Sequence, residues 1–235
     1  MSSPSTDTME EERLKSAYSR RTPNDFRYSF FNFGNLFTVQ ERERAILKSL
    51  KKALKEPLSD QKILEVGCGS GVVLLDFVRW GARADNLTGL DLLPHSIAQA
   101  KERLPSAVHL LCQNISTLPF SNDEFDLVVQ STVFSSILDQ ATRQRAAAEM
   151  LRVLKRGGCI LWYDFFFDNP NNPDVRGMKK NEIEVLFPNC EITIRRVTLA
   201  PPLTRRLGYF LSTLLAYFPF LRTHYVAIIR KVPSA

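Results

Sequence analysis

The chain has 235 residues, of which 44% are hydrophobic and 24% are charged, which is typical of a soluble globular protein built around one large domain. The formal net charge of +6 raises the hypothesis of nucleic-acid binding. The basic residues are scattered in pairs, however, and no nucleic-acid module accompanies them, so no nucleic-acid partner is expected. Four cysteines lie far apart and never form a CxxC pair, which argues against a metal site or a disulfide framework and favours a reducing compartment.

The amino-terminal part divides into two expected segments. Residues 1–12 are polar and acidic, carry no signal-peptide pattern and are expected to form a disordered tail. Residues 13–57 place aromatic side chains between polar and basic ones, and we expect them to form an aromatic and helical lid. A helix is predicted to begin at Thr38, because Glu41 three positions later completes a capping box. Pro57 is expected to end this helix.

From Lys62 onward, strand-like and helix-like segments alternate, and this core is expected to span residues 58–235. Such alternation favours a mostly parallel, doubly wound sheet with ligands at the carboxyl ends of its strands. An apolar insertion at about residues 200–222 interrupts the pattern before the last strand. Its apolar run is too short to span a membrane. A cytoplasmic location is therefore expected. Strands are predicted over residues 62–66, 86–92, 108–114, 125–131, 159–167, 191–200 and 224–232, and helices over 70–80, 94–104, 140–155 (capped by Gly157 and Gly158) and 178–187.

The turn after the first predicted strand is rich in glycine. Residues 63–71 read ILEVGCGSG, with Gly67, Gly69 and Gly71 at alternate positions. Dinucleotide-binding enzymes need a third glycine one place later, where this chain has Val72. The pattern therefore favours close approach of a different adenosyl ligand. Asp91, at the end of the second strand, is placed to accept hydrogen bonds from both ribose hydroxyls of such a ligand.

Residues after the third and fourth strands complete the expected site. Asn114 is expected to hydrogen-bond an adenine edge. Ile115 and Leu92 are expected to sandwich the ring, and Gln130 to lie beneath the cofactor.

Four segments in order, ILEVGCGSG, GLDLLPHSIAQAK, NISTLPFSNDEFDLVV and LRVLKRGGCILWYDF, resemble class I S-adenosylmethionine-dependent methyltransferases over about residues 35–232. The resemblance implies S-adenosylmethionine as cofactor and a Rossmann-like seven-stranded sheet of order 3-2-1-4-5-7-6 with the last strand antiparallel. One departure is that relatives often carry Gly-Asp-Ala where this chain has Gln113, Asn114 and Ile115. The predicted cofactor-binding residues are Tyr28, Glu65, Gly67, Cys68 (as a small residue of the glycine loop), Gly69, Gly71, Asp91, Leu92, Asn114, Ile115 and Gln130.

Methyl transfer to an oxygen of high pKa needs a general base as well as positioning. Asp164, at the end of the fifth strand, and His224, before the last strand, are the candidate bases. No residue of the sequence marks the acceptor itself.

Two aromatic segments are expected to enclose the acceptor. The amino-terminal one would fold over the cofactor and bring Tyr28 or Phe33 near the sulfonium. The apolar insertion has three open interpretations: helix packing against the sheet, a wall of the acceptor pocket, or peripheral membrane contact with Arg205, Arg206 and Arg222 as anchors.

The predicted function is methylation, O-directed in the favoured reading, of a small or medium-sized, partly apolar acceptor such as a natural product or a lipid-linked saccharide. The alternatives are C-methylation of a quinone or lipid precursor and a non-catalytic adenosyl-binding protein. The sequence does not indicate an oligomeric state.

Overall fold

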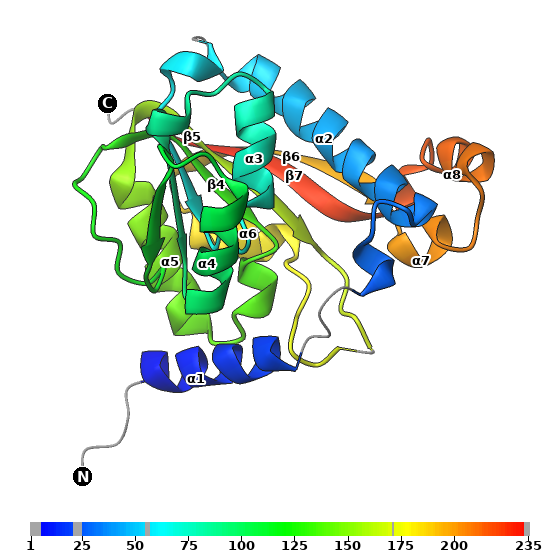
Figure 1. The fold of residues 1–235 in the computed structure, drawn as a ribbon, viewed down its shortest axis with the longest axis horizontal. Coiled ribbons are helices and arrows are strands. Elements are labelled where there is room, and N and C mark those ends of the chain that lie inside the picture. The colour runs from blue at the N-terminus through cyan, green and yellow to red at the C-terminus, as the bar shows by residue number, and fades with distance from the viewer. Residues whose placement is uncertain (1–5, 21–24, 55–56, 171, 233–235) are drawn as a thin grey trace.

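The computed structural model describes residues 6–20, 25–54, 57–170 and 172–232 and contains one seven-stranded sheet (Figure 1). The strand order is β3-β2-β1-β4-β5-β7-β6, with β7 antiparallel to both of its neighbours. The predicted Rossmann-like topology is therefore confirmed. The strands are β1 (Ile63–Val66), β2 (Leu87–Asp91), β3 (His109–Cys112), β4 (Phe125–Ser131), β5 (Leu154–Phe165), β6 (Cys190–Leu199) and β7 (Arg222–Lys231).

Helices cover both faces of the sheet. One buried hydrophobic cluster lies between the sheet and helices α2, α3 and α4 and includes Leu50, Phe77 and Ile97. The other lies beneath α5 and α6 and includes Met150 and Ile183. The helices are α1 (Thr6–Ser19), α2 (Phe33–Ala53), α3 (Val72–Arg79), α4 (Pro94–Arg103), α5 (Gln140–Val153), α6 (Lys180–Leu186), α7 (Pro201–Thr204) and α8 (Tyr209–Leu215), with short 3-10 helices η1 (Phe26–Tyr28), η2 (Leu58–Asp60), η3 (Ala84–Asn86), η4 (Phe134–Ser136) and η5 (Pro219–Leu221).

The amino-terminal segment differs from the prediction of a disordered tail. Residues 6–12 form the first half of α1, which lies along one end of the sheet (Figure 1), whereas residues 1–5 lie outside the described residues. Glu10 Oε1 accepts a hydrogen bond of 2.6 Å from the backbone N–H of Leu138, and Arg13 donates to the carbonyl of Ser136. These long-range contacts stabilise a polar helix whose own sequence contains too little apolar surface to indicate it.

Helix α2 begins at Phe33, five residues before the predicted start. The side chain of Asn32 caps it by accepting hydrogen bonds from the backbone of Gly34 at 3.0 Å and of Asn35 at 3.4 Å. Glu41 forms no capping box and instead accepts the backbone N–H of Leu199 at 2.8 Å. A stronger cap upstream therefore extends the helix, and Glu41 fastens it to the end of β6.

Helix α5 ends at Val153, and the chain enters β5 at once. Gly157 and Gly158, predicted to end that helix, lie inside β5, where the pairing with β4 shifts register between Phe125 and Leu127. Gly157 has a φ of 85°, a conformation that suits a bulge in a strand.

Candidate functional site

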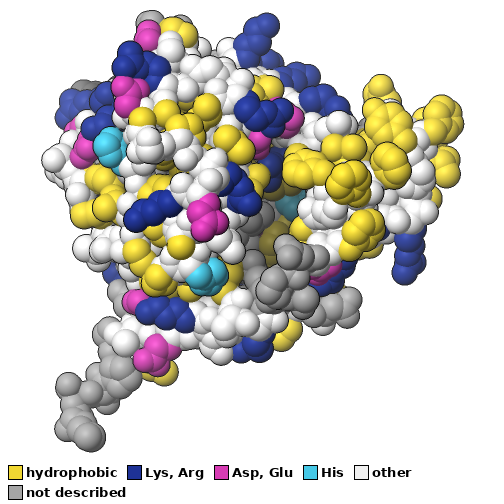
Figure 2. Space-filling view, in the orientation of Figure 1, with side chains coloured by type: hydrophobic (Ala, Val, Ile, Leu, Met, Phe, Trp, Pro, Cys, Tyr) yellow, Lys and Arg dark blue, Asp and Glu magenta, His cyan; other side chains and the backbone are white. Residues whose placement is uncertain are grey.

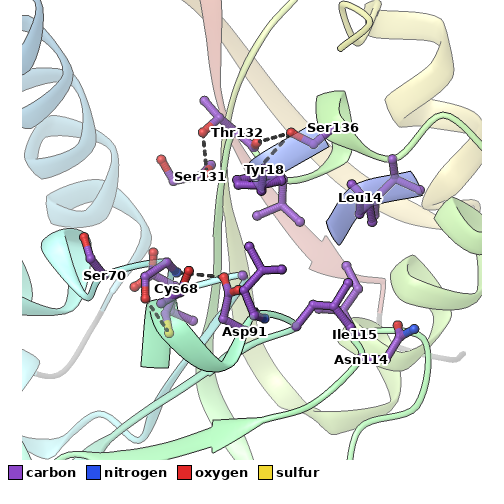
Figure 3. Close-up of a pocket in the computed structure, with 18 of the residues that line it drawn as sticks. Leu14, Tyr18, Cys68, Ser70, Asp91, Asn114, Ile115, Ser131, Thr132 and Ser136 are labelled. Carbon is purple, nitrogen blue, oxygen red and sulfur yellow. Dashed lines mark hydrogen bonds between the residues drawn. The ribbon is translucent and has the colours of Figure 1, made fainter. Parts of the chain in front are cut away.

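A cavity of about 300 Å³ lies at the carboxyl ends of β1, β2 and β4, underneath α1 (Figure 3). Its volume is at the lower end of the range of roughly 300–1,000 Å³ for small-molecule sites. Eight of the predicted cofactor residues line it. These are Glu65, Gly67, Cys68, Gly69, Asp91, Leu92, Asn114 and Ile115, and they share the cavity with residues that include Glu10, Glu11, Leu14, Tyr18, Arg42, Ser131, Thr132, Val133, Ser136, Ile137 and Thr142.

The alternate glycines of the loop after β1 meet two different needs. Gly69 has a φ of 53°, and a Cβ added there would meet no atom within 4 Å, so its bare backbone borders open space. Gly71 has a φ of 79° and caps α3, and a Cβ there would come within 2.6 Å of Leu104. Gly69 thus leaves room for a ligand, whereas Gly71 allows α3 and α4 to pack closely.

Asp91 holds the glycine loop in place. Its Oδ2 accepts the backbone N–H of Gly69 at 2.9 Å, and its Oδ1 accepts that of Leu93 at 2.9 Å (Figure 3). Burial raises the pKa of Asp91, and the two backbone donors oppose that rise. Each carboxylate oxygen can accept a further hydrogen bond from a ligand in the cavity.

Glu65 contributes a second carboxyl group to the same cavity. Its side chain is 2% exposed, and its Oε2 has no hydrogen-bond partner in the described part of the chain. Burial raises the pKa of Glu65 well above its ordinary value, although the nearby Arg42 guanidinium acts in the opposite direction. A buried carboxyl oxygen without a partner is costly, and a cationic ligand group would satisfy it.

Asn114 contacts the helix above the cavity. Its Oδ1 accepts the N–H of Ser116 at 2.9 Å, and its Nδ2 donates to Glu11 of α1 at 3.5 Å. An aspartate here would place a second carboxylate beside Glu11, which also pairs with Lys15 at 2.7 Å. The departure from the Gly-Asp-Ala pattern therefore has a physical reason, since only the amide can donate to α1.

The predicted lid of residues 13–57 contains Leu14 and Tyr18, but the sequence analysis did not identify either of them as a cavity residue. Leu14 and Tyr18 project from α1 into the cavity, opposite Asp91 (Figure 3). The Tyr18 hydroxyl lies 3.3 Å from the hydroxyl of Ser136, which in turn donates to the carbonyl of Thr132 at 3.4 Å. The four-residue spacing of Leu14 and Tyr18 is a helical signal that the polar flanks obscured.

Three predicted cofactor residues lie outside the cavity lining: Gly71, Tyr28 and Gln130. Tyr28 is 68% exposed. Gln130 is fully buried and supports the wall instead: its Oε1 accepts the N–H of Val133 at 3.1 Å, and its Nε2 donates to the carbonyl of Tyr163 at 3.4 Å. These bonds hold a loop in which Thr132 has a φ of 58°, an uncommon conformation for a β-branched residue.

The structure does not bring the two predicted bases to the cavity wall. Asp164 is fully buried, and its oxygens accept the backbone N–H groups of Ser135 at 3.1 Å and Phe165 at 3.0 Å. Burial raises the pKa of Asp164 to about 7. His224 stacks on Tyr163 with ring centroids 5.0 Å apart, and burial lowers its pKa to about 4. Placement at a strand end therefore did not ensure access to the cavity, because η4 covers Asp164.

Comparisons with known proteins agree with this geometry. Residues 63–158 match a family model described as a methyltransferase domain. The chain is 35% identical over 100 residues to a ubiquinone biosynthesis O-methyltransferase of Methylobacterium sp. (strain 4-46), an alignment that covers 41% of this chain and 39% of that protein. It is 24% identical over 163 residues to a ubiquinone/menaquinone biosynthesis C-methyltransferase of Geotalea daltonii, covering 67% of this chain and 65% of that protein. The chain thus spans less than two thirds of the length of either relative.

A solved structure shares the fold over nearly the whole chain. N-methyltransferase NodS from Bradyrhizobium japonicum, in complex with S-adenosylhomocysteine, superposes with a TM-score of 0.66 at 16% identity and covers 96% of this chain and 99% of that one. The likeness shows the fold, and the family match shows the domain. Residues 63–158 therefore correspond to a methyltransferase domain, and the chain has the fold of the class I S-adenosylmethionine-dependent methyltransferases.

Proposed function

We propose that the chain binds S-adenosylmethionine in this cavity and transfers its methyl group to a small-molecule acceptor with an apolar part. The observation that carries the proposal is the pair of carboxyl groups, Glu65 and Asp91, which line one cavity together with the open backbone at Gly69. A ligand that suits them carries a cationic group and a vicinal diol separated by a slender chain. S-adenosylmethionine has these groups.

The described residues fit this cofactor. Asp91 would accept the ribose hydroxyls while its backbone donors hold it in place. Glu65 Oε2, which lacks a partner, would accept from the ammonium of the methionine part. Leu92 and Ile115 would flank the adenine, beside the amide of Asn114.

Bound in this way, the cofactor would supply an electrophilic methyl group on its sulfonium. The residues of the chain then contribute mainly by positioning, which is worth up to roughly 7–11 kcal/mol in favourable intramolecular reactions. Leu14 and Tyr18 cover one side of the cavity and would limit the access of water to the bound cofactor. The hydroxyls of Tyr18 and Ser136, on the wall opposite Asp91, are placed to orient a polar atom of the acceptor.

We propose that residues 6–20 form the lid of a core that begins near residue 58, because Leu14 and Tyr18 of α1 line the cavity. The aromatic segment from Phe26 to Phe33 was assigned to the same lid, and its large side chains are exposed. Leu14 presents an apolar side chain to the cavity, which is consistent with an apolar acceptor. Such acceptors partition into bilayers, so peripheral membrane contact fits the same proposal.

We favour O-methylation of a natural product or lipid-linked saccharide, because an O-methyltransferase is among the curated relatives. C-methylation of a quinone or lipid precursor is the second candidate. The alignment with the C-methyltransferase of Geotalea daltonii is the longer of the two, at 163 residues against 100, which supports that candidate.

Transfer of labelled methyl groups tests the proposal. The protein is incubated with S-adenosylmethionine labelled in its methyl group and with separate pools of phenolic natural products, quinol precursors, lipid-linked saccharides and small polar amines. We expect label in a product that organic solvent extracts. Label in small polar amines alone would contradict the apolar acceptor, and cofactor binding without transfer to any pool would favour a non-catalytic adenosyl-binding protein.

A further inference from the structure

Twelve large apolar side chains remain exposed in two segments that the cofactor cavity does not use. Five lie between Phe26 and Phe33 and seven between Tyr209 and Phe220. Among them Phe31 is 89% exposed and Phe210 is 79% exposed. Figure 2 shows hydrophobic side chains gathered over α8 and the start of α2. We call these twelve residues the aromatic surface.

The two segments form one continuous surface because α2 packs against α7 and α8. A Cβ at Gly34 would lie 2.8 Å from the backbone of Arg205, so the start of α2 is in close contact with the end of α7. The hydroxyls of Thr38 and Thr204 lie 3.4 Å apart, and the rings of Phe37 and Tyr209 meet edge to face at 5.9 Å. The exposed rings are therefore carried on a packed support.

The charged side chains in the carboxyl-terminal part of the chain, which contributes to the aromatic surface, are all positively charged. Residues 192–232 contain seven Lys and Arg residues and no Asp or Glu. Arg205 and Arg206 are exposed immediately before α8. A second copy docked on the same surface would bring these arginines together, which disfavours self-association. An anionic partner is complementary instead.

A basic hollow of about 620 Å³ adjoins the aromatic surface, between α2 and β6. Arg44 and Lys48 of α2 line it together with Arg195 of β6, and the one acidic group among its lining residues, Glu41, accepts the backbone N–H of Leu199. Pro219 lines it as well, and its neighbours Phe218 and Phe220 belong to the aromatic surface. Cationic side chains in a hollow beside exposed rings match a phosphate headgroup next to its acyl chains.

We propose that this face docks on an anionic phospholipid bilayer, with the rings at the headgroup level and a headgroup phosphate in the basic hollow. Aromatic side chains favour the membrane interface, and nearby arginines add electrostatic attraction to anionic lipid. None of the helices described here combines the length and apolarity needed to cross a bilayer, so the contact would be peripheral. The proposal goes beyond methyl transfer, and its test needs no activity.

Vesicle flotation tests the apolar part of the contact. We expect the protein to float with vesicles of phosphatidylglycerol and phosphatidylcholine, and the double variant F31S/F210S to lose most of this binding. Both side chains are exposed, so the fold should be unaffected. The control is Val185→Ser, which removes an apolar side chain that is 64% exposed on α6 and lies outside the aromatic surface; this variant should float like the parent protein.

Arginine variants test the electrostatic part of the contact. R205Q/R206Q should weaken binding on the order of fivefold for each arginine removed, and added salt should reduce the binding of the parent protein. The control K101Q removes an exposed charge of α4 and should have little effect. Equal flotation with pure phosphatidylcholine vesicles would overturn the proposal. Absence of flotation would also overturn it. This includes the case in which sedimentation velocity shows that the protein forms a dimer through the aromatic surface.

Discussion

Replacing Glu10 by Ala should release α1 from the cavity. The Glu10 carboxylate accepts the N–H of Leu138 at 2.6 Å and two donors of Arg13 at 2.8 and 2.9 Å. Burial alone would raise the pKa of Glu10, but these donors outweigh it and lower the pKa, so the group is ionised at neutral pH. Arg13 in turn donates to the carbonyl of Ser136, so one substitution disturbs the whole attachment.

The magnitude follows from the contact with Leu138. A hydrogen bond to a charged group contributes about 1.5–3 kcal/mol, so the equilibrium between docked and released α1 should shift by roughly 10- to 150-fold. Amide hydrogen exchange along α1 should accelerate by that factor, and S-adenosylhomocysteine should dissociate faster in stopped-flow displacement.

Glu12→Ala is the matched control, because Glu12 is exposed on the same helix and the change in helix propensity is the same. Equal exchange and dissociation rates in the two variants would refute the role given to Glu10.

Three further predictions concern buried or bridging polar groups. The raised pKa of Glu65 predicts that the affinity for S-adenosylhomocysteine rises with pH as this carboxyl group ionises. In calorimetric titrations, E65Q should flatten this rise, and a pH profile in E65Q equal to that of the parent protein would contradict the role of Glu65. Asp164 has a folded pKa of about 7 against an ordinary 3.8, so its bound proton stabilises the native state fully below about pH 4. That stability is lost as pH rises through 7, by about 4 kcal/mol in all, and D164N should show a weaker decline in urea unfolding between pH 5 and 8. N114D should accelerate exchange in α1 by placing a carboxylate beside Glu11, and E11Q should restore the parent rate; no effect of N114D would exclude this contact.

The central part of the fold was predictable from local patterns. The alternation of strands and helices, the glycine turn and the position of Asp91 depend on neighbours in sequence, and the family topology then brings Gly69 and Asp91 together. The two residues are neighbours at one cavity because parallel strands end at one edge of the sheet.

The contacts of α1 were not predictable in the same way. Glu10 and Leu138 are separated by 128 residues, and nothing in the polar amino-terminal sequence indicates its docking place. The aromatic residues near Tyr28 were predicted to belong to the lid, and their side chains are exposed in the structure. Asp164 was assigned to the strand end correctly, but the burial of its carboxyl group by the turn at Ser135 depends on tertiary packing.

Isothermal titration of the purified protein with S-adenosylhomocysteine tests the central claim most directly. We expect one site with measurable heat in the parent protein. In D91A, the loss of two charge-assisted hydrogen bonds, each about 1.5–3 kcal/mol, should reduce affinity by at least roughly 100-fold. Absence of binding to the parent protein, or equal affinity in D91A, would contradict the assignment of this cavity to an adenosyl cofactor.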